Sequence, residues 1–291
     1  MFKKYPLLKG HLLVFTTILI WSLAFVGNKV LLAYITPIEV MIYRFLFAYV
    51  VLFLLYPKWS LPNSLKDELY FFMLGFLGIF LYFLLENFAL KYTQATNVGL
   101  YMGAIPIFTA ILAHFITKDE KLSLNIVSGF VVAIVGIAMI LLDGAKFELQ
   151  LKGDFLAILG ALTFALYSVA LKNAPANYNY IVITRKSFFY GVVLMLLYIV
   201  LLHKNLHILE LTKPAVYINI IFLGLFASSL AFIFYKRGVE IIGSVKSTNY
   251  IYLVPLLTAL FGIIILNERV DLQMCIGGIL ILLGLYISQK K

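Results

Sequence analysis

Ten apolar stretches, each long enough to cross a lipid bilayer, follow one another along the chain with short polar segments between them. A hydrocarbon core about 30 Å thick needs roughly 20 apolar residues in an α-helix. A soluble core helix is not apolar on every side over such a length. The pattern therefore predicts an all-α membrane protein with ten transmembrane helices, over residues 11–32, 38–56, 69–90, 97–116, 125–142, 154–171, 182–202, 215–235, 247–266 and 273–288.

Composition supports this class of protein. Hydrophobic residues make up 63% of the chain and charged residues only 12%, whereas globular domains carry about 25% charged residues. The first apolar stretch is longer than a signal-peptide core and leads into Asn28-Lys29-Val30 without a cleavage pattern, so we expect it to be retained. The single cysteine, Cys275, excludes an internal disulfide and a cysteine metal cluster.

The distribution of basic residues predicts the orientation. Of the 23 Lys and Arg residues, fifteen lie in segments on the side of the N-terminus and six on the opposite side, while Lys29 and Arg44 lie within predicted helices. Under the positive-inside rule, this asymmetry places both termini in the cytoplasm. It also accounts for the net charge of +10 without a nucleic-acid partner. We expect a multi-pass protein of the cytoplasmic (inner) membrane, with its function inside the helix bundle because no loop is long enough for a separate domain.

The sequence also repeats itself. A shift of 149 residues places Leu74-Gly75 on Leu223-Gly224, Tyr101 on Tyr250 and Pro106 on Pro255. A shift of 148 then aligns Glu120 with Glu268, Gly129 with Gly277 and Gly136 with Gly284. Five helices in each half is an odd number, so the second half must cross the membrane in the opposite sense. The predicted architecture is two inverted-topology repeats of five helices, over 12–142 and 153–288.

Several motifs carry a family resemblance. Trp21 lies within the first predicted helix, Arg44 lies in YRFLFA in the second, and GAIPIFTAIL in one half is matched by YLVPLLTALF in the other. Together with the ten helices, these motifs resemble the drug/metabolite transporter superfamily, and in particular its EamA-type members with two tandem domains. The resemblance implies gradient-driven transport of small metabolites such as amino acids, amines or nucleosides, without ATP.

Two prolines and one acid are the first candidates for the substrate pathway. Pro106 and Pro255 fall near the middle of equivalent helices, where each is predicted to kink the helix and free carbonyl groups that need protein or cavity water. Glu86 shares a helix face with Tyr82, and a carboxylate in hydrocarbon must face a cavity, be paired or be protonated. Tyr235 is the repeat counterpart of Glu86. We expect a site for a substrate ammonium or a coupling proton here, although an acid near the interface that pairs with Lys91 is the alternative.

Further polar and aromatic residues complete the predicted substrate site. Asn97 and Tyr101 share one helix face, and Asn249 and Tyr250 stand in the equivalent helix of the second half. With Trp21, they are predicted to form an aromatic and hydrogen-bonding pocket that suits an amine. The alternative for each of these aromatic residues is packing or an interfacial belt.

Three basic residues near helix ends have structural and functional interpretations. Arg44 is expected to reach the interface or to pair with Glu39. Lys29 and Lys172 end equivalent helices at opposite faces of the membrane, where they are candidate gate residues or ordinary helix-end lysines.

Several functions fit these features. The favoured one is a secondary transporter of small metabolites that works by alternating access as an exporter, and an importer of a cationic amine or nucleoside-type nutrient is the alternative. Less favoured are a non-transporting scaffold and a membrane-embedded enzyme, since HExxH and GxSxG motifs are missing. The expected partners are a small-molecule substrate, membrane lipid and a coupling proton, in a monomer or homodimer, with no metal, cofactor or nucleic acid.

Overall fold

The computed structural model describes residues 6–58, 61, 63–93, 95–117, 119–141, 149–202, 206–266 and 272–290. In these residues the chain is helical and no strand is present, which confirms the predicted all-α class. The first half contains α1 (Pro6–Leu31), α2 (Pro37–Leu55), α3 (Leu65–Gly75), η1 (Phe76–Leu81), α4 (Tyr82–Tyr92), α5 (Ala95–Met102), α6 (Ile105–Ile116) and α7 (Leu124–Leu141).

The second half repeats this order of elements and adds two short 3₁₀ segments. It contains α8 (Leu151–Lys172), α9 (Tyr180–Leu201), η2 (Ile208–Thr212), α10 (Pro214–Phe222), η3 (Leu223–Leu230), α11 (Ala231–Ile242), α12 (Ser244–Asn249), η4 (Tyr250–Tyr252), α13 (Leu253–Leu266) and α14 (Leu272–Gln289). Nine helical spans in the described part of the chain are long and apolar enough to cross a membrane. The predicted span 247–266 is divided among α12, η4 and α13, so the expected count of ten is not confirmed.

Two spans contain π-helical segments at equivalent places. α3, η1 and α4 form one span of 28 residues, and α10, η3 and α11 form another of 29. η1 and η3 are the π-helical parts, and η1 begins directly after Gly75, whose repeat counterpart Gly224 lies at the start of η3. Since π-helical segments disturb the regular i→i+4 ladder, both spans change their side-chain register in the middle of the bundle.

The two prolines predicted to kink their helices lie directly after breaks. The helix 97–116 is interrupted at Gly103-Ala104, and Pro106 then occupies the first turn of α6. In the second half the 3₁₀ segment η4 precedes α13, and Pro255 lies in the first turn of that helix. A proline in a first turn displaces no hydrogen bond, because the N–H there has no intrahelical acceptor. The breaks themselves therefore interrupt both helices.

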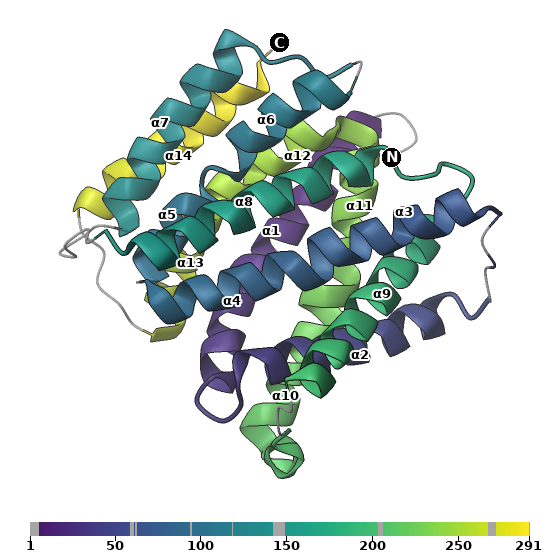
Figure 1. Ribbon diagram of the computed structural model, residues 1–291. Coiled ribbons are helices and arrows are strands. Elements are labelled where there is room, and N and C mark those ends of the chain that lie inside the picture. The colour runs from purple at the N-terminus through teal and green to yellow at the C-terminus, as the bar shows by residue number, and fades with distance from the viewer. Residues whose placement is uncertain are drawn as a thin grey trace.

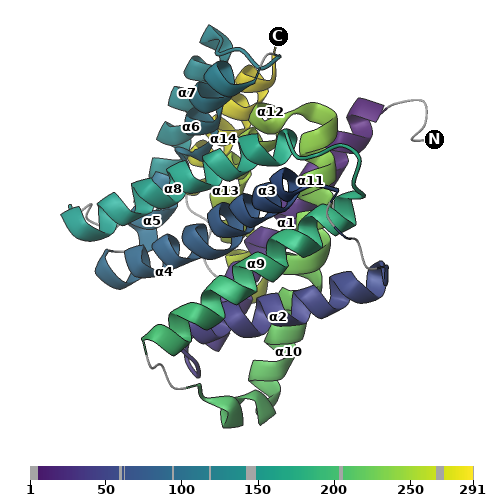
Figure 2. The same cartoon turned by 45° about the vertical axis from the view of Figure 1, so that its right-hand side comes forward.

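The two halves are interlocked. α1 packs mainly on α11 and α13 of the second half, and its counterpart α8 packs mainly on α4 and α6 of the first half. α2 packs on α9 and η3, and α7 lies along α14, as both views show (Figure 1 and Figure 2). α1 begins and α14 ends at the same end of the bundle, which we call the terminal end (Figure 2).

Glycines fix the register between α7 and α14. A Cβ atom added to Gly129 would lie 2.6 Å from the carbonyl oxygen of Gly284, and one added to Gly136 would lie 2.6 Å from that of Gly277. Because the partner's number falls as the glycine's number rises, the two helices run antiparallel, as counterparts in inverted repeats do. Close glycine contacts of this kind bring backbones together where lipid supplies no hydrophobic drive. The two-repeat architecture is confirmed, and superposition of the halves by a rotation stays a prediction.

Candidate functional site

Aromatic rings from both halves meet in the middle of the bundle. The ring of Phe164 on α8 lies 4.9 Å from the Tyr82 ring and 5.9 Å from each of the Trp21 and Tyr235 rings, measured between centroids. Phe232 on α11 lies 5.4 Å from Trp21. We call these five residues the central aromatic cluster. It unites three of the predicted site residues, which come from α1, α4 and α11.

Polar contacts orient the cluster. The indole Nε1 of Trp21 donates to the carbonyl oxygen of Ala227 in η3, at 3.0 Å. The hydroxyl of Tyr235 is completely buried and lies 2.9 Å from the hydroxyl of Ser168 on α8. The accepting carbonyl of Ala227 lies within the π-helical segment η3. These bonds fix one edge of the Trp21 ring and one edge of the Tyr235 ring, and the faces of both rings remain available for contacts within the cluster.

Glu86 belongs to a polar group beside the aromatic cluster. The Tyr82 hydroxyl donates to the carboxylate of Glu86 at 3.3 Å, and Glu86 retains accessible surface. Arg44 on α2 lies within electrostatic range of Glu86, but the two form no ion pair within 4.0 Å. Its Nε donates to Ser228 of η3 at 2.9 Å. The expected alternative partner, Lys91, is instead found over the ring of Tyr92.

The prediction that Arg44 reaches the interface or pairs with Glu39 is wrong. Arg44 is 5% exposed, and its guanidinium carbon lies 4.8 Å from the ring centroid of Phe45 and 5.0 Å from that of Phe83. Glu39 is occupied elsewhere, since it accepts bonds from Thr36 in a capping box at the start of α2 and from His207. The arginine is therefore left with a serine as its protein partner and with two nitrogens, Nη1 and Nη2, that bond no other described residue.

Asn97 and Tyr101 lie away from the central aromatic cluster. The amide of Asn97 donates to Thr93 at 3.1 Å and to the carboxylate of Asp154 at 3.2 Å, and Thr93 donates to the same carboxylate at 2.7 Å. Tyr101 lies close enough to interact electrostatically with Asp154. This network joins the start of α5 to the first turn of α8, at the end of the bundle opposite the terminal end.

The predicted counterparts in the second half have equivalent positions at the terminal end. Tyr250 lies 2.9 Å from Nδ1 of His11 on α1, and Asn249 donates to the carbonyl oxygen of Ser288 on α14 at 3.4 Å. Tyr250 thus bonds the first helix of the opposite half, and Tyr101 interacts electrostatically with the first helix of the half opposite to its own. The structure does not bring these four residues together with Trp21, Tyr82 and Glu86.

Lys172 holds four helix ends together at the terminal end. Its ammonium lies 2.6 Å from Asp119 and 3.0 Å from Glu120, both between α6 and α7. Glu120 also accepts from the hydroxyl of Ser244 at 2.5 Å and from the backbone N–H of Val245 at 3.0 Å, both in α12. The hydrogen bond from Lys172 holds the pKa of the Asp119 carboxyl below its ordinary value. The side chain of Lys29 and residue Glu268 lie outside the described residues, so the equivalent arrangement at the opposite end is not described.

Most of the chain matches one family of membrane proteins. The model of the EamA-like transporter family matches residues 8–142 and again 151–289. The chain belongs to the EamA-like transporter family. An uncharacterized transporter of Archaeoglobus fulgidus is 26% identical over 97% of this chain and 98% of that protein, and one of Clostridium kluyveri is 25% identical over 97% and 94%. The fold is similar to that of a solved crystal structure with a TM-score of 0.79 at 20% identity, covering 96% of each chain.

This EamA-like protein is therefore a multi-pass membrane transporter, as its family and its apolar helices agree. Sequence reasoning did not identify Ser228 and Asp154 as partners of site residues, and it did not predict the π-helical segments. The signal for the latter was available, because Gly75 and Gly224 are repeat counterparts at their starts. Nothing in the local sequence indicated which of several polar residues each buried group would meet.

Proposed function

We propose that this EamA-like protein is a secondary transporter that exports small metabolites with an amino group, such as amino acids, amines or related compounds, across the cytoplasmic membrane. Its mechanism is alternating access, and the protein performs no chemical step on its substrate. The observation that carries the substrate class is the pair Glu86 and Arg44, two opposite charges in electrostatic range that do not neutralise each other directly.

Each charge suits one end of a zwitterion. Glu86 keeps accessible surface beside Tyr82, so a substrate ammonium reaches the carboxylate next to an aromatic face, where cation–π attraction adds to the ion pair. Arg44 offers the fork of Nη1 and Nη2, which bonds a carboxylate in bidentate fashion. A substrate that carries both groups compensates two charges whose burial in a low-dielectric bundle is otherwise costly.

The two repeat counterparts Glu86 and Tyr235 support alternating access. Glu86 has accessible surface, whereas Tyr235 has none and bonds Ser168, one turn before Lys172 on α8. Two equivalent positions with unequal access fit a bundle that is closed at the terminal end. Lys172 is then a gate residue of that end, and a proton on Glu86 is the coupling ion, since a carboxylate that alternates between substrate and proton links the two fluxes.

Transport in proteoliposomes tests this function. Vesicles preloaded with a panel of neutral amino acids, their decarboxylated amines and nucleosides are given a pH gradient, and efflux is compared with uptake. We expect efflux of an amino acid to exceed that of its amine, and Glu86→Gln to lower it at least tenfold and to remove its pH dependence. Glu210→Gln, which removes an acid from the η2 segment outside the bundle, serves as the matched control.

Two results would contradict the proposal. Unchanged transport by Glu86→Gln at normal melting temperature removes this residue from the site. Preferred uptake of an amine or a nucleoside instead identifies the protein as an importer and contradicts a zwitterionic substrate.

A further inference from the structure

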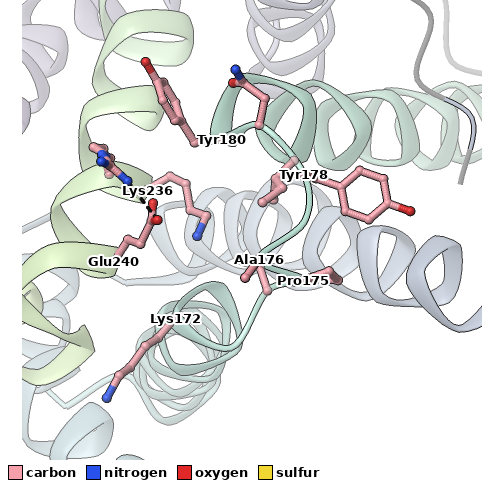
Figure 3. A pocket seen from close by; sticks show the side chains of 11 residues that line it. Lys172, Pro175, Ala176, Tyr178, Tyr180, Lys236 and Glu240 are labelled. Carbon is pink, nitrogen blue, oxygen red and sulfur yellow. Dashed lines mark ion pairs between the residues drawn. The ribbon is translucent and has the colours of Figure 1, made fainter. Parts of the chain in front are cut away.

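A cavity lies at the terminal end, and none of the five residues of the central aromatic cluster lines it. Its volume is about 180 Å³, and its walls are the segment between α8 and α9 together with α11. Figure 3 shows the side chains that line it, with Ala176 and Pro175 from the connecting segment opposite Lys236 and Glu240 from α11. Since a water takes about 30 Å³ in the liquid, this cavity has room for a small solute with a few waters.

Most of the charged and polar side chains around the cavity are already bonded to the protein. Lys172 is held by Asp119 and Glu120, neither of which is part of the cavity lining. Arg237 forms an ion pair with Glu240 at 2.8 Å, so these two charges cancel. Lys236 is thus the one charged group in the described lining without an ion pair.

The side chain of Lys236 is buried and directed into this space. The residue is 3% exposed, and within the described residues its ammonium has neither a hydrogen-bond acceptor nor a carboxylate within ion-pair distance. Figure 3 shows its nitrogen pointing toward the middle of the cavity, whereas Lys172 and Tyr178 point away from it. A charged ammonium at this depth is costly without a partner, so the cavity is suited to a ligand that brings negative charge.

The start of α9 adds positive potential to the same space. Asn179 and Tyr180, the N-cap and first residue of this 22-residue helix, are both part of the lining. The helix dipole is positive at this end, and its first N–H groups have no intrahelical acceptor. Within the described part of the chain, the Asn179 side chain bonds the N–H of Ile181, at 2.8 Å, and no other group. A buried lysine opposite a helix N-terminus is a recurring arrangement for binding oxyanions.

We propose that this cavity binds a phosphate group, with Lys236 as its cationic ligand. The group belongs either to free inorganic phosphate or a small phosphate ester, or to the headgroup of an anionic lipid, since this end of the bundle is at the membrane boundary. The site is separate from Glu86 and Arg44, so it stands or falls independently of the transport proposal.

Thermal unfolding of the purified full-length protein in neutral detergent tests the site. Sodium phosphate is titrated against sodium chloride at equal ionic strength, because a ligand that binds the folded state raises the melting temperature. We expect a saturable rise for the wild type, and Lys236→Gln to need at least tenfold more phosphate for the same rise. Lys66→Gln, an exposed lysine in the first turn of α3, is the matched control and should respond like the wild type.

A second variant and a second measurement keep the test decisive. Ala176→Phe fills the mouth of the cavity from an exposed position and leaves Lys236 in place, so it should abolish the phosphate response. This variant keeps the site testable if Lys236→Gln fails to fold. Native mass spectrometry after reconstitution with phosphatidylcholine and phosphatidylglycerol counts retained phosphatidylglycerol.

The outcomes separate the two sources of phosphate. A phosphate response lost in both variants supports a free oxyanion, and retained phosphatidylglycerol lost in both supports a lipid headgroup. Equal responses and equal lipid retention in the wild type and Lys236→Gln overturn the site, and so does a response that Lys66→Gln loses to the same extent.

Discussion

Replacing Glu120 by Gln should open the terminal end of the bundle. The carboxylate of Glu120 receives three donors, from Lys172 at 3.0 Å, Ser244 at 2.5 Å and the N–H of Val245 at 3.0 Å. Bonds to a charged acceptor contribute about 1.5–3 kcal/mol and neutral ones about 0.5–1.5 kcal/mol, so the loss is about 1 kcal/mol for each donor. Lys172 keeps its bond to Asp119, but the Asp119 side chain is 72% exposed and an exposed pair adds little.

The three donors together give an effect of about 3 kcal/mol, which corresponds to a roughly 150-fold shift of population toward the open terminal end. The assay uses Ser168→Cys as a reporter, because this serine is buried beside Tyr235 one turn before Lys172. The native Cys275 is exposed and is first changed to Ser. In vesicles with the terminal end outward, a membrane-impermeant maleimide should label the reporter much faster when Glu120 is Gln.

The matched control is Glu240→Gln, which removes an acid that is 44% exposed at the same end and pairs with Arg237. Its labelling rate should equal that of the reporter protein alone. If Glu120→Gln labels no faster than this control, the contacts of Glu120 do not hold the end closed, and the gate assignment of Lys172 fails with them.

Three further predictions concern charge, packing and pH. Arg44→Lys keeps the charge but loses the planar fork, so the substrate concentration for half-maximal efflux of an amino acid should rise about tenfold; an equal rise for the amine would contradict a carboxylate contact. Gly136→Ala should cost about 1–3 kcal/mol of unfolding free energy because backbone faces it, whereas Gly99→Ala meets the flexible Leu141 side chain and should cost less, as melting temperatures would show. The pKa of Asp119 is lowered in the folded state, so this carboxyl stabilises the protein only while it is ionised. The small difference in melting temperature between wild type and Asp119→Asn at pH 7 should therefore vanish in acid. A difference that stays constant with pH would refute this prediction.

The helices and the repeat were predictable because both depend directly on the order of residues along the chain. The apolar lengths predicted nine of the spans, and the matches of Gly129 with Gly277 and of Gly136 with Gly284 mark the helices that pack against each other. The remaining predicted span is not a single helix, because a 3₁₀ segment interrupts it. Such a segment has no strong signal in an apolar sequence, so the break was not predicted.

The partners of the buried polar groups were much less predictable. In a membrane protein, the helix face that packs on protein and the face that contacts lipid are both apolar. The periodicity of apolar residues therefore does not tell which neighbour a side chain meets. Arg44 was expected near Glu39, but His207, distant in sequence, takes that carboxylate. Asn97 and Tyr101 were expected at the centre, yet Asn97 bonds Asp154 at one end of the bundle and Tyr101 lies near the same carboxylate.

The interlocked packing of the halves has a consequence for biosynthesis. α1 leaves the ribosome first but finds its main partners, α11 and α13, only after most of the chain has been made. α8, in turn, completes the surroundings of α4 and α6. The first five helices can thus enter the membrane one by one, but they lack the surfaces against which they fold. A nascent first half must therefore wait in the bilayer with Arg44 and Asn97 still lacking Ser228 and Asp154, their partners in the second half.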